Sequence, residues 1–498
     1  MEASLCALYS IIFLVLIYKL KFFSADGITR SFLALAFLLK VAGGLALWWL
    51  YTYYYTDRSS ADIYKYFDDS AVVHAALKNS PADYLHLLFG TGSDEHLKQY
   101  YLKMDHWYRE FEGGMINEDR TMIRANAILR LFSFGHFNVH TVFFAFLSLA
   151  GLVALYKTFA PALKGKQRTF AVLLFLFPSL LFWGSGVLKE SLALFAMGGM
   201  IRQFSLLTGG GHRLKALVFF LLFAFLLVLT KAYVFIAFLP GLAIWLALKA
   251  SGQNYALLKS AMVVLLFGAL ALLVPKADLA GRIVTKQRMF IHVAEGGTHL
   301  LHDNKFVYIE PAIKDPIIPT GTKGYARIRD GVPYTYWFRE RPKDTLTAVS
   351  DFDTSSYWVF YSQPPSGSRI GIGKLDTTVQ SLLAHSPAAF WNTLARPYPW
   401  EAGSLLLALP AIENVFILAL LLASVIFSSR GKCDKRHFYP GLCFVVLLFI
   451  LIGLTTPVMG AIVRYKVPAL PFLFACALLL LDKEKLAARL PFLKSLIA

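Results

Sequence analysis

Long apolar segments recur along most of this chain and limit the folds that it can adopt. Several run for about 18 residues or more with hardly a charged side chain, which is the length a helix needs to cross roughly 30 Å of hydrocarbon. Of the 498 residues, 57% are hydrophobic and only 16% are charged, whereas soluble domains carry about 25% charged residues. The sequence therefore predicts an all-α polytopic membrane protein.

We expect about eleven transmembrane helices from the length and spacing of these segments. Two connections between them are very short, Trp183-Gly184-Ser185-Gly186 and Thr230-Lys231, so a different number of spans remains open. The expected spans lie near 3–21, 31–54, 137–158, 169–184, 187–207, 216–230, 232–248, 259–275, 403–428, 439–457 and 465–481.

The net charge of +18 is concentrated in alternate connections. Lysine and arginine favour the cytoplasmic side of a membrane protein, which predicts an extracytoplasmic N-terminus and a cytoplasmic C-terminus. This distribution indicates membrane lipids as partners and argues against nucleic acid. The basic residues concerned are Lys19, Lys21, Arg30, Lys157, Lys164, Lys166, Arg168, Arg202, Arg213, Lys215, Lys249, Lys259, Arg430, Lys432, Lys435, Arg436, Lys483, Lys485, Arg489 and Lys494.

Two long connections fall on the predicted outer face and divide the chain into five parts. Residues 1–54 hold the first two spans, 55–136 form the first extracytoplasmic loop, and 137–275 hold six spans. Residues 276–402 form an extracytoplasmic insertion, and 403–498 hold three spans and a basic tail.

The insertion has the composition of a small β-containing unit. The stretches KFVYIE, YARIRDGVPYTYW, SSYWVFYS and SRIGIG are typical of strands, and Asp330-Gly331 is typical of a hairpin turn. From Asp376 to Leu394 the pattern predicts an amphipathic helix at the membrane surface, interrupted at Pro387.

The first outer loop contains the acidic stretch ADIYKYFDDS. Asp62, Tyr66 and Asp69 stand at i, i+4 and i+7, so a helix would present all three on one face. One interpretation is structural, with Ser59 as N-cap and Asp62 at the third helical position. The other is that Asp62 accepts a proton from an acceptor hydroxyl as a general base. Both interpretations can hold together.

Lys189 and Glu190 are expected about one turn inside an otherwise apolar span. Ionisable residues at such depth are costly, and they usually face a cavity or each other. They could form a structural pair, or Lys189 could snorkel to the interface. Alternatively, Lys189 binds a phosphate at the membrane surface, with Glu190 in support.

Two later motifs place cations on the outer side. Arg396 and Glu401 bracket a Pro-aromatic run, which also suits simple interfacial anchoring. Arg464 and Lys466 lie in GAIVRYKVPALPF, against the positive-inside bias, and the planar fork of an arginine suits phosphate.

Metal-ligand spacing is absent from the sequence. The four cysteines show no such spacing, and His299 and His302 lack a third ligand. We therefore predict no metal-ligating residues. Any cofactor stays unknown, and a divalent cation remains open.

Four motifs, in their order along residues 51–472, resemble the GT-C superfamily of polyprenyl-phosphate-sugar glycosyltransferases. They are YYYTDRSSADIYKYFDDS, PSLLFWGSGVLKES, ARPYPWE and GAIVRYKVPALPF. The chain is also similar to a group of uncharacterised multi-spanning bacterial envelope proteins. Unlike the usual family pattern, the acidic loop follows the second span, and Ile63 replaces the second residue of an adjacent acidic pair.

The resemblance implies an inverting transfer of a sugar from a polyprenyl-phosphate-linked donor to an envelope glycan or lipid acceptor, in the bacterial inner membrane. Asp62 matches the catalytic carboxylate, with Asp57 or Asp69 as second candidates. The implied donor-phosphate residues are Lys189, Arg396, Arg464 and Lys466, supported by Tyr66, Glu190 and Glu401. Two alternatives stay open: an O-antigen-type polymerase or ligase that uses a diphosphate-linked donor, and a non-enzymatic transporter or envelope assembly component.

Overall fold

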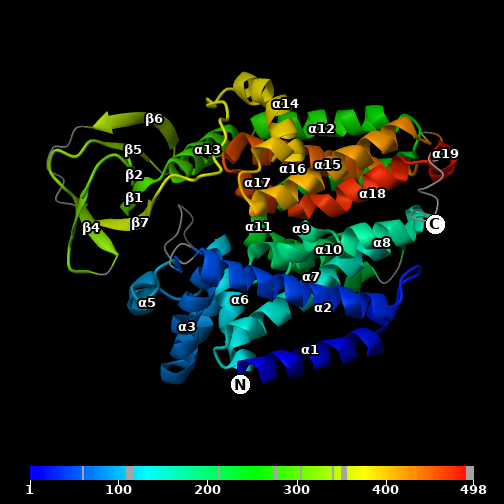
Figure 1. The fold of residues 1–498 in the computed structure, drawn as a ribbon. Helices are drawn as coiled ribbons and strands as arrows, with labels where there is room; N and C mark the ends of the chain where they lie inside the picture. Colours follow the sequence, from blue (N-terminus) through cyan, green and yellow to red (C-terminus); the bar gives the residue numbers. More distant parts are fainter. Residues whose placement is uncertain are drawn as a thin grey trace.

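The computed structural model describes residues 1–489, except 56, 59–60, 108–116, 211–212, 274–277, 303–304, 323, 339–340, 349–355, 430 and 432. The chain is mostly helical, and a small antiparallel sheet projects from one end of the helical bundle (Figure 1). The helices are α1 Glu2–Lys19, α2 Arg30–Trp49, α3 Asp62–Asn79, α4 Pro81–Phe89, α5 Asp94–Tyr101, α6 Glu118–Ser133, α7 Phe137–Phe159, α8 Gln167–Phe175, α9 Pro178–Phe182, α10 Lys189–Gly209, α11 Arg213–Ser251, α12 Ala256–Leu273, α13 Leu279–Glu295, α14 Val379–Ala395, α15 Leu405–Ile426, α16 Lys435–Thr455, α17 Met459–Tyr465, α18 Leu470–Leu480 and α19 Lys483–Arg489.

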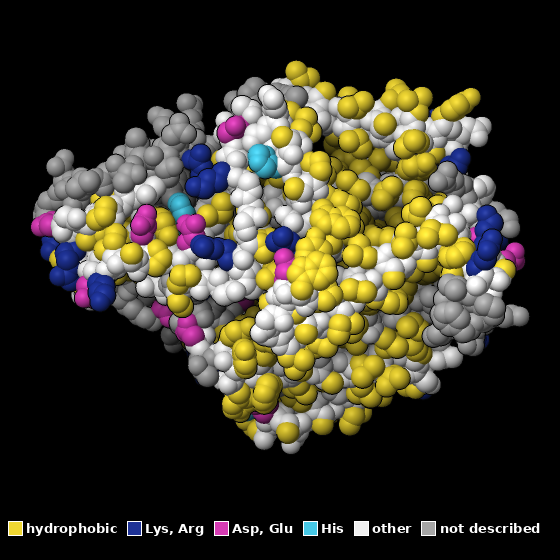
Figure 2. All heavy atoms as spheres, turned by 45° about the horizontal axis from the view of Figure 1, so that its top comes forward, with side chains coloured by type: hydrophobic (Ala, Val, Ile, Leu, Met, Phe, Trp, Pro, Cys, Tyr) yellow, Lys and Arg dark blue, Asp and Glu magenta, His cyan; other side chains and the backbone are white. Residues whose placement is uncertain are grey.

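Within the described residues, eight helices are long and apolar enough to cross a membrane. They are Glu2–Lys19, Arg30–Tyr54, Phe137–Ala162, Lys189–Gly209, Arg213–Ser251, Leu405–Ile426, Lys435–Thr455 and Met459–Leu480, and Ala256–Ala271 is a shorter apolar helix. Hydrophobic side chains cover the middle of the bundle, and charged ones gather toward its two ends (Figure 2). These features are those of an integral membrane protein.

Helix α11 doubles back on itself at Lys231, whose φ of −152° and ψ of 77° are not helical. The ring of Phe204 on α10 lies 5.8 Å from the Phe220 ring and 6.0 Å from the Trp245 ring. Because these two contacts come from opposite sides of Lys231, both arms run beside α10. The expected separation of 216–230 from 232–248 is therefore present, with Lys231 at the tip.

The expected span 169–184 is instead two short helices, α8 and α9. Pro178 begins α9 and cannot donate the backbone hydrogen bond that would continue α8. Pro178 thus divides the segment, and the following WGSG stretch leads into α10.

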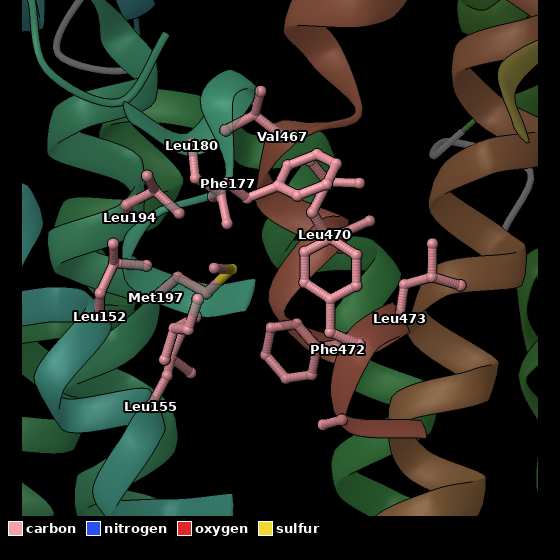
Figure 3. Close-up of a cluster of buried hydrophobic side chains, with 14 of the residues drawn as sticks. Leu152, Leu155, Phe177, Leu180, Leu194, Met197, Val467, Leu470, Phe472 and Leu473 are labelled. Atoms are coloured by element: carbon pink, nitrogen blue, oxygen red, sulfur yellow. The ribbon is translucent and has the colours of Figure 1, made fainter. Parts of the chain in front are cut away.

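Helices α7 and α10 approach unusually closely. A Cβ atom on Gly198 would lie 2.0 Å from the carbonyl oxygen of Gly151, so neither position has room for a side chain. The core continues from these two helices across α8 and α9 to α18, where Leu155 and Met197 face Leu470 and Phe472 (Figure 3).

Most of the described basic connections meet at the end of the bundle away from the sheet. Lys166 donates hydrogen bonds to the carbonyl oxygens of Leu478 and Leu481, and Lys483 donates one to Gly165. The sequence expectation that alternate connections share one side agrees with this arrangement. Arg430, Lys432 and Lys494 lie outside the described residues.

The insertion forms a seven-stranded antiparallel sheet in the order β3-β4-β7-β1-β2-β5-β6. The strands are β1 Gly297–His302, β2 Lys305–Ile309, β3 Ile317–Pro319, β4 Tyr325–Ile328, β5 Tyr334–Phe338, β6 Arg341–Ala348 and β7 Tyr357–Gln363.

The expected strands KFVYIE, YARI, YTYW and SSYWVFYS are present, but two details of the insertion are corrected. Asp330-Gly331 does not join a hairpin, because β7, β1 and β2 lie between β4 and β5. SRIGIG is not a strand, although Arg369 forms an isolated bridge with Val458.

Helix α14 forms where the sequence places it, but it continues through Pro387 without the expected interruption. The loop predicted to be the first outer one folds as helices α3 to α6. Helices α3 and α6, together with α10, α11 and α17, carry the charged cluster described next.

Candidate functional site

A chain of ion pairs joins four distant parts of the sequence. An Nη atom of Arg464 on α17 lies 2.8 Å from the Asp62 carboxylate at the start of α3, and its Nε lies 3.0 Å from the Glu190 carboxylate on α10. Glu190 also accepts a hydrogen bond from Lys231 at 2.8 Å. These four residues are named here the Asp62–Lys231 network.

Asp62, Glu190 and Lys231 stand where their helices begin or bend, and Arg464 stands in the last turn of α17. Asp62 is the first residue of α3, whose N-cap is Ala61, and a carboxylate in the first turn is favoured by the helix dipole. The expected cap with Asp62 at the third position is therefore wrong, and Ser59 lies outside the described residues. Glu190 is in the first turn of α10, which begins at Lys189 and not a turn earlier as expected.

Lys231 reaches Glu190 because the turn of α11 brings it beside the start of α10. The Lys231 ammonium also lies 3.1 Å from the Tyr233 hydroxyl and 4.9 Å from the centre of the Tyr465 ring. Aromatic faces attract ammonium groups. The two tyrosines thus complete a polar lining around a lysine that is 2% exposed.

A second branch of charges lies beside Tyr66. The Lys189 ammonium is 3.0 Å from the Glu118 carboxylate and 2.8 Å from the Asp119 carboxylate, both in the first turn of α6. It also lies 5.8 Å from the centre of the Tyr66 ring. Burial, followed by the charges of Asp119 and Asp62, raises the pKa of Tyr66 well above its usual value, so its hydroxyl stays protonated at neutral pH.

Exposure increases from the interior of the network toward Asp62. The Glu190 side chain is 0% exposed and that of Arg464 is 11% exposed, whereas Asp62 is 29% exposed. Glu118, at the end of the second branch, is 30% exposed. A ligand approaching this site therefore meets the Asp62 and Glu118 carboxylates first, with Arg464 directly behind Asp62.

The two branches together are electrically balanced. Four cations and four carboxylates take part, which gives a formal charge of 4 − 4 = 0. The cations are Lys65, which lies 3.6 Å from Asp62, Lys189, Lys231 and Arg464, and the carboxylates are Asp62, Glu118, Asp119 and Glu190. For the site to stay neutral, a bound anion would have to displace one of these carboxylates from its cation, or one of the carboxylates would have to take up a proton when the anion binds.

Asp69 has a structural role. Its carboxylate is buried and accepts hydrogen bonds from the backbone amides of Asp105 and His106, at 3.0 and 2.7 Å. These bonds hold the segment after α5 against α3. Asp57, the other second candidate, is exposed on the loop before α3.

Lys466 is also structural, although the sequence suggests a phosphate ligand. It is 2% exposed and donates a hydrogen bond to the side-chain oxygen of Asn414. Asn414 in turn donates to the carbonyl oxygens of Ala395 and Pro397, at 3.3 and 3.1 Å. Lys466 thus supports, through Asn414, the backbone on both sides of Arg396.

Arg396 and Glu401 form their own pair, separate from the Asp62–Lys231 network. The Nε atom of Arg396 lies 3.5 Å from the Glu401 carboxylate, and its guanidinium lies 5.6 Å from the centre of the Tyr398 ring. Glu401 also accepts a hydrogen bond from the Tyr398 amide. Arg396 remains 26% exposed, so it stays available to a ligand.

Sequence reasoning missed three members of the cluster, Lys231, Glu118 and Asp119. Lys231 was noted as part of a short connection between two spans, and its apolar surroundings were the available signal. The acidic pair follows Asn117, which caps α6 by accepting from the amides of Asp119 and Arg120. An asparagine before an acidic pair is a typical helix start in a sequence, but the proximity of Glu118 and Asp119 to Lys189 depends on tertiary packing.

No group of three or more metal-binding side chains is found within the part of the chain that the structure describes. Comparisons with protein families, curated proteins and solved structures found no match. The function is therefore inferred from the residues of the site.

Proposed function

We propose that this protein is a GT-C-type membrane glycosyltransferase that transfers a sugar from a polyprenyl-phosphate-linked donor to an envelope glycan or lipid acceptor. The observation that carries the proposal is the 2.8 Å contact between Asp62 and Arg464 at the accessible end of a buried charge network. A general base and a phosphate-binding arginine must lie this close if one acts on the attacking hydroxyl and the other on the leaving phosphate.

The reaction requires no change in the total charge beside Arg464. The acceptor hydroxyl loses its proton to Asp62 as its oxygen bonds to the anomeric carbon of the sugar. The bond from that carbon to the phosphate oxygen breaks, and polyprenyl phosphate leaves with the electron pair and one more negative charge. One negative charge thus disappears from Asp62 while another appears on the phosphate, and the Arg464 guanidinium can stabilise either.

The balanced network also explains how the base would be released when the donor binds. Before binding, Asp62 and Arg464 neutralise each other. A donor phosphate that occupies the guanidinium frees the carboxylate, which then faces the acceptor. Glu190 keeps the other edge of the guanidinium in place, so Arg464 need not move.

Mass spectrometry of lipids that copurify with the detergent-solubilised protein tests this proposal. Wild type is compared with Arg464→Lys, which keeps the positive charge opposite Glu190 but loses the planar fork, and with Lys164→Gln, an exposed change at the opposite end. A polyprenyl-phosphate sugar depleted in Arg464→Lys alone is the expected result.

Other outcomes redirect or contradict the proposal. A diphosphate-linked oligosaccharide would favour the polymerase or ligase alternative. Equal amounts of a polyprenyl-linked sugar in all three proteins would remove Arg464 from the donor site. Bulk phospholipid alone, in a preparation loaded with extracted polyprenyl-linked sugars, would favour the non-enzymatic alternative.

A further inference from the structure

A pocket with charged side chains lies at the basic end of the bundle, opposite the Asp62–Lys231 network. It has a volume of about 380 Å³ and is formed by the turn between α1 and α2, the end of α7, the start of α8, and α10. Its charged side chains are Lys157, Arg202 and Asp26. None of these belongs to the Asp62–Lys231 network, so the pocket requires an explanation of its own.

The two cations are held in place by the protein. An Nη atom of Arg202 donates to the carbonyl oxygen of Lys157 at 3.2 Å, and the Lys157 ammonium lies 3.5 Å from the carbonyl oxygen of Lys21. The ammonium also lies 5.3 Å from the centre of the Phe22 ring. These backbone contacts orient the cations, and neither cation forms an ion pair with a carboxylate within the described part of the chain.

The position of Asp26 is also fixed. The Tyr156 hydroxyl donates to the carbonyl oxygen of Asp26 at 2.7 Å. The next residue, Gly27, has a φ of +83°, and a Cβ atom there would lie 2.9 Å from that same hydroxyl. Glycine is therefore required at this turn, and it presents Asp26 at the rim of the pocket.

Depth separates the positive and negative groups. Lys157 and Arg202 are half-buried, whereas Asp26 is exposed. Arg202 stands seven residues before the end of α10, which is about 10 Å along a helix axis. In a phosphoethanolamine lipid the phosphate is nearer the acyl chains and the ammonium is nearer the water, which is the same order.

We propose that this pocket binds a phosphoethanolamine headgroup, with its phosphate between Lys157 and Arg202 and its ammonium at Asp26. The lining Gln167 amide supplies a further donor for the phosphate. The exposed Phe22 beside Lys157 marks the side on which acyl chains would leave the pocket. A phosphoglycerol headgroup lacks the cation for Asp26, and a choline headgroup lacks an N–H donor.

Native mass spectrometry of the delipidated full chain in detergent tests this assignment. The protein is titrated with dioleoyl lipids that carry ethanolamine, glycerol or choline headgroups. We expect the ethanolamine lipid to bind about tenfold more tightly than the other two, as one charge-assisted hydrogen bond would give. Soluble phosphoethanolamine is added as a competitor. Competition only at large excess identifies the lipid as the source, and competition at equal concentration identifies the soluble molecule.

Variants separate the two halves of the pocket. Asp26→Asn should weaken the ethanolamine lipid about tenfold and leave the glycerol lipid unchanged. Lys157→Gln should weaken the binding of all three lipids to a similar degree. If Lys157→Gln lowers the melting temperature, Arg202→Gln replaces it in this test, with the same expected result. The exposed changes Lys164→Gln and Glu484→Gln serve as matched controls. Equal affinity of the wild-type protein for all three lipids would overturn the assignment. An equal effect of Asp26→Asn on the binding of all three lipids would overturn it as well.

Discussion

Replacing Glu190 by glutamine removes the central charge of the Asp62–Lys231 network. Glu190 is fully buried, 2.8 Å from the Lys231 ammonium and 3.0 Å from the Arg464 guanidinium. Removing one partner of a buried ion pair costs about 3–5 kcal/mol, because the other charge stays buried without compensation. Arg464 keeps Asp62 as a partner, so most of the cost falls on Lys231. We therefore expect Glu190→Gln to lower the free energy of unfolding by about 3 kcal/mol.

The measurement is reversible unfolding in mixed micelles, followed by tryptophan fluorescence. The double variant Glu190→Gln with Lys231→Met removes both charges, and its loss should be smaller than the sum of the two single losses by about 0.5–3 kcal/mol. Glu484→Gln on the exposed face of α19 should stay within about 0.5 kcal/mol of wild type. A loss under about 1 kcal/mol for Glu190→Gln, or strictly additive losses, would show that Glu190 and Lys231 are not a coupled buried ion pair.

Three further predictions concern residues around the site. Asp69→Asn should lower the free energy of unfolding by about 1–3 kcal/mol, because it weakens two buried hydrogen bonds from backbone amides. The turnover per folded molecule should stay at the wild-type value, and a selective loss of turnover would make Asp69 a catalytic candidate again. Lys466→Met should loosen the segment around Arg396 through Asn414, seen as faster hydrogen exchange in residues 395–401, and unchanged exchange there would argue against this support. Gly198→Leu should prevent folded protein from accumulating, because its Cβ would lie 2.0 Å from the Gly151 carbonyl oxygen; a normal yield and melting temperature would show that α7 and α10 are not packed this closely.

Local patterns predicted the elements well, but not their partners. Apolar length predicted most of the spanning helices, and the aromatic-rich stretch SSYWVFYS predicted the strand at Tyr357–Gln363. The hairpin at Asp330-Gly331 failed because turn residues report a local bend, while the partner of β4 is β7, a strand more than 25 residues further along. Pro387 was expected to interrupt α14, but the helix tolerates it.

The candidate site shows the same limit. Asp62 and Arg464 were singled out separately, for a carboxylate in an outer loop and an arginine placed against the positive-inside bias. Their direct contact spans 402 positions in the sequence, which no local pattern can predict. Lys466, only two residues beyond Arg464, carries the same sequence signal, yet it points to Asn414 inside the bundle. Tertiary packing decides which of two nearby cations is accessible.

In the proposed mechanism the Asp62 carboxylate removes the proton of the acceptor. The direct test is the release of polyprenyl phosphate by the reconstituted protein, supplied with extracted polyprenyl-linked sugars and envelope glycan acceptors. Asp62→Asn should slow this release at least about 100-fold with nearly the wild-type melting temperature, since the residue is 29% exposed. Asp68→Asn is the matched control, because Asp68 lies on the same helix, is 44% exposed and pairs with Arg58. We expect a normal rate in Asp68→Asn and a lost rate in Asp62→Asn, and a wild-type rate in Asp62→Asn would exclude this carboxylate as the base.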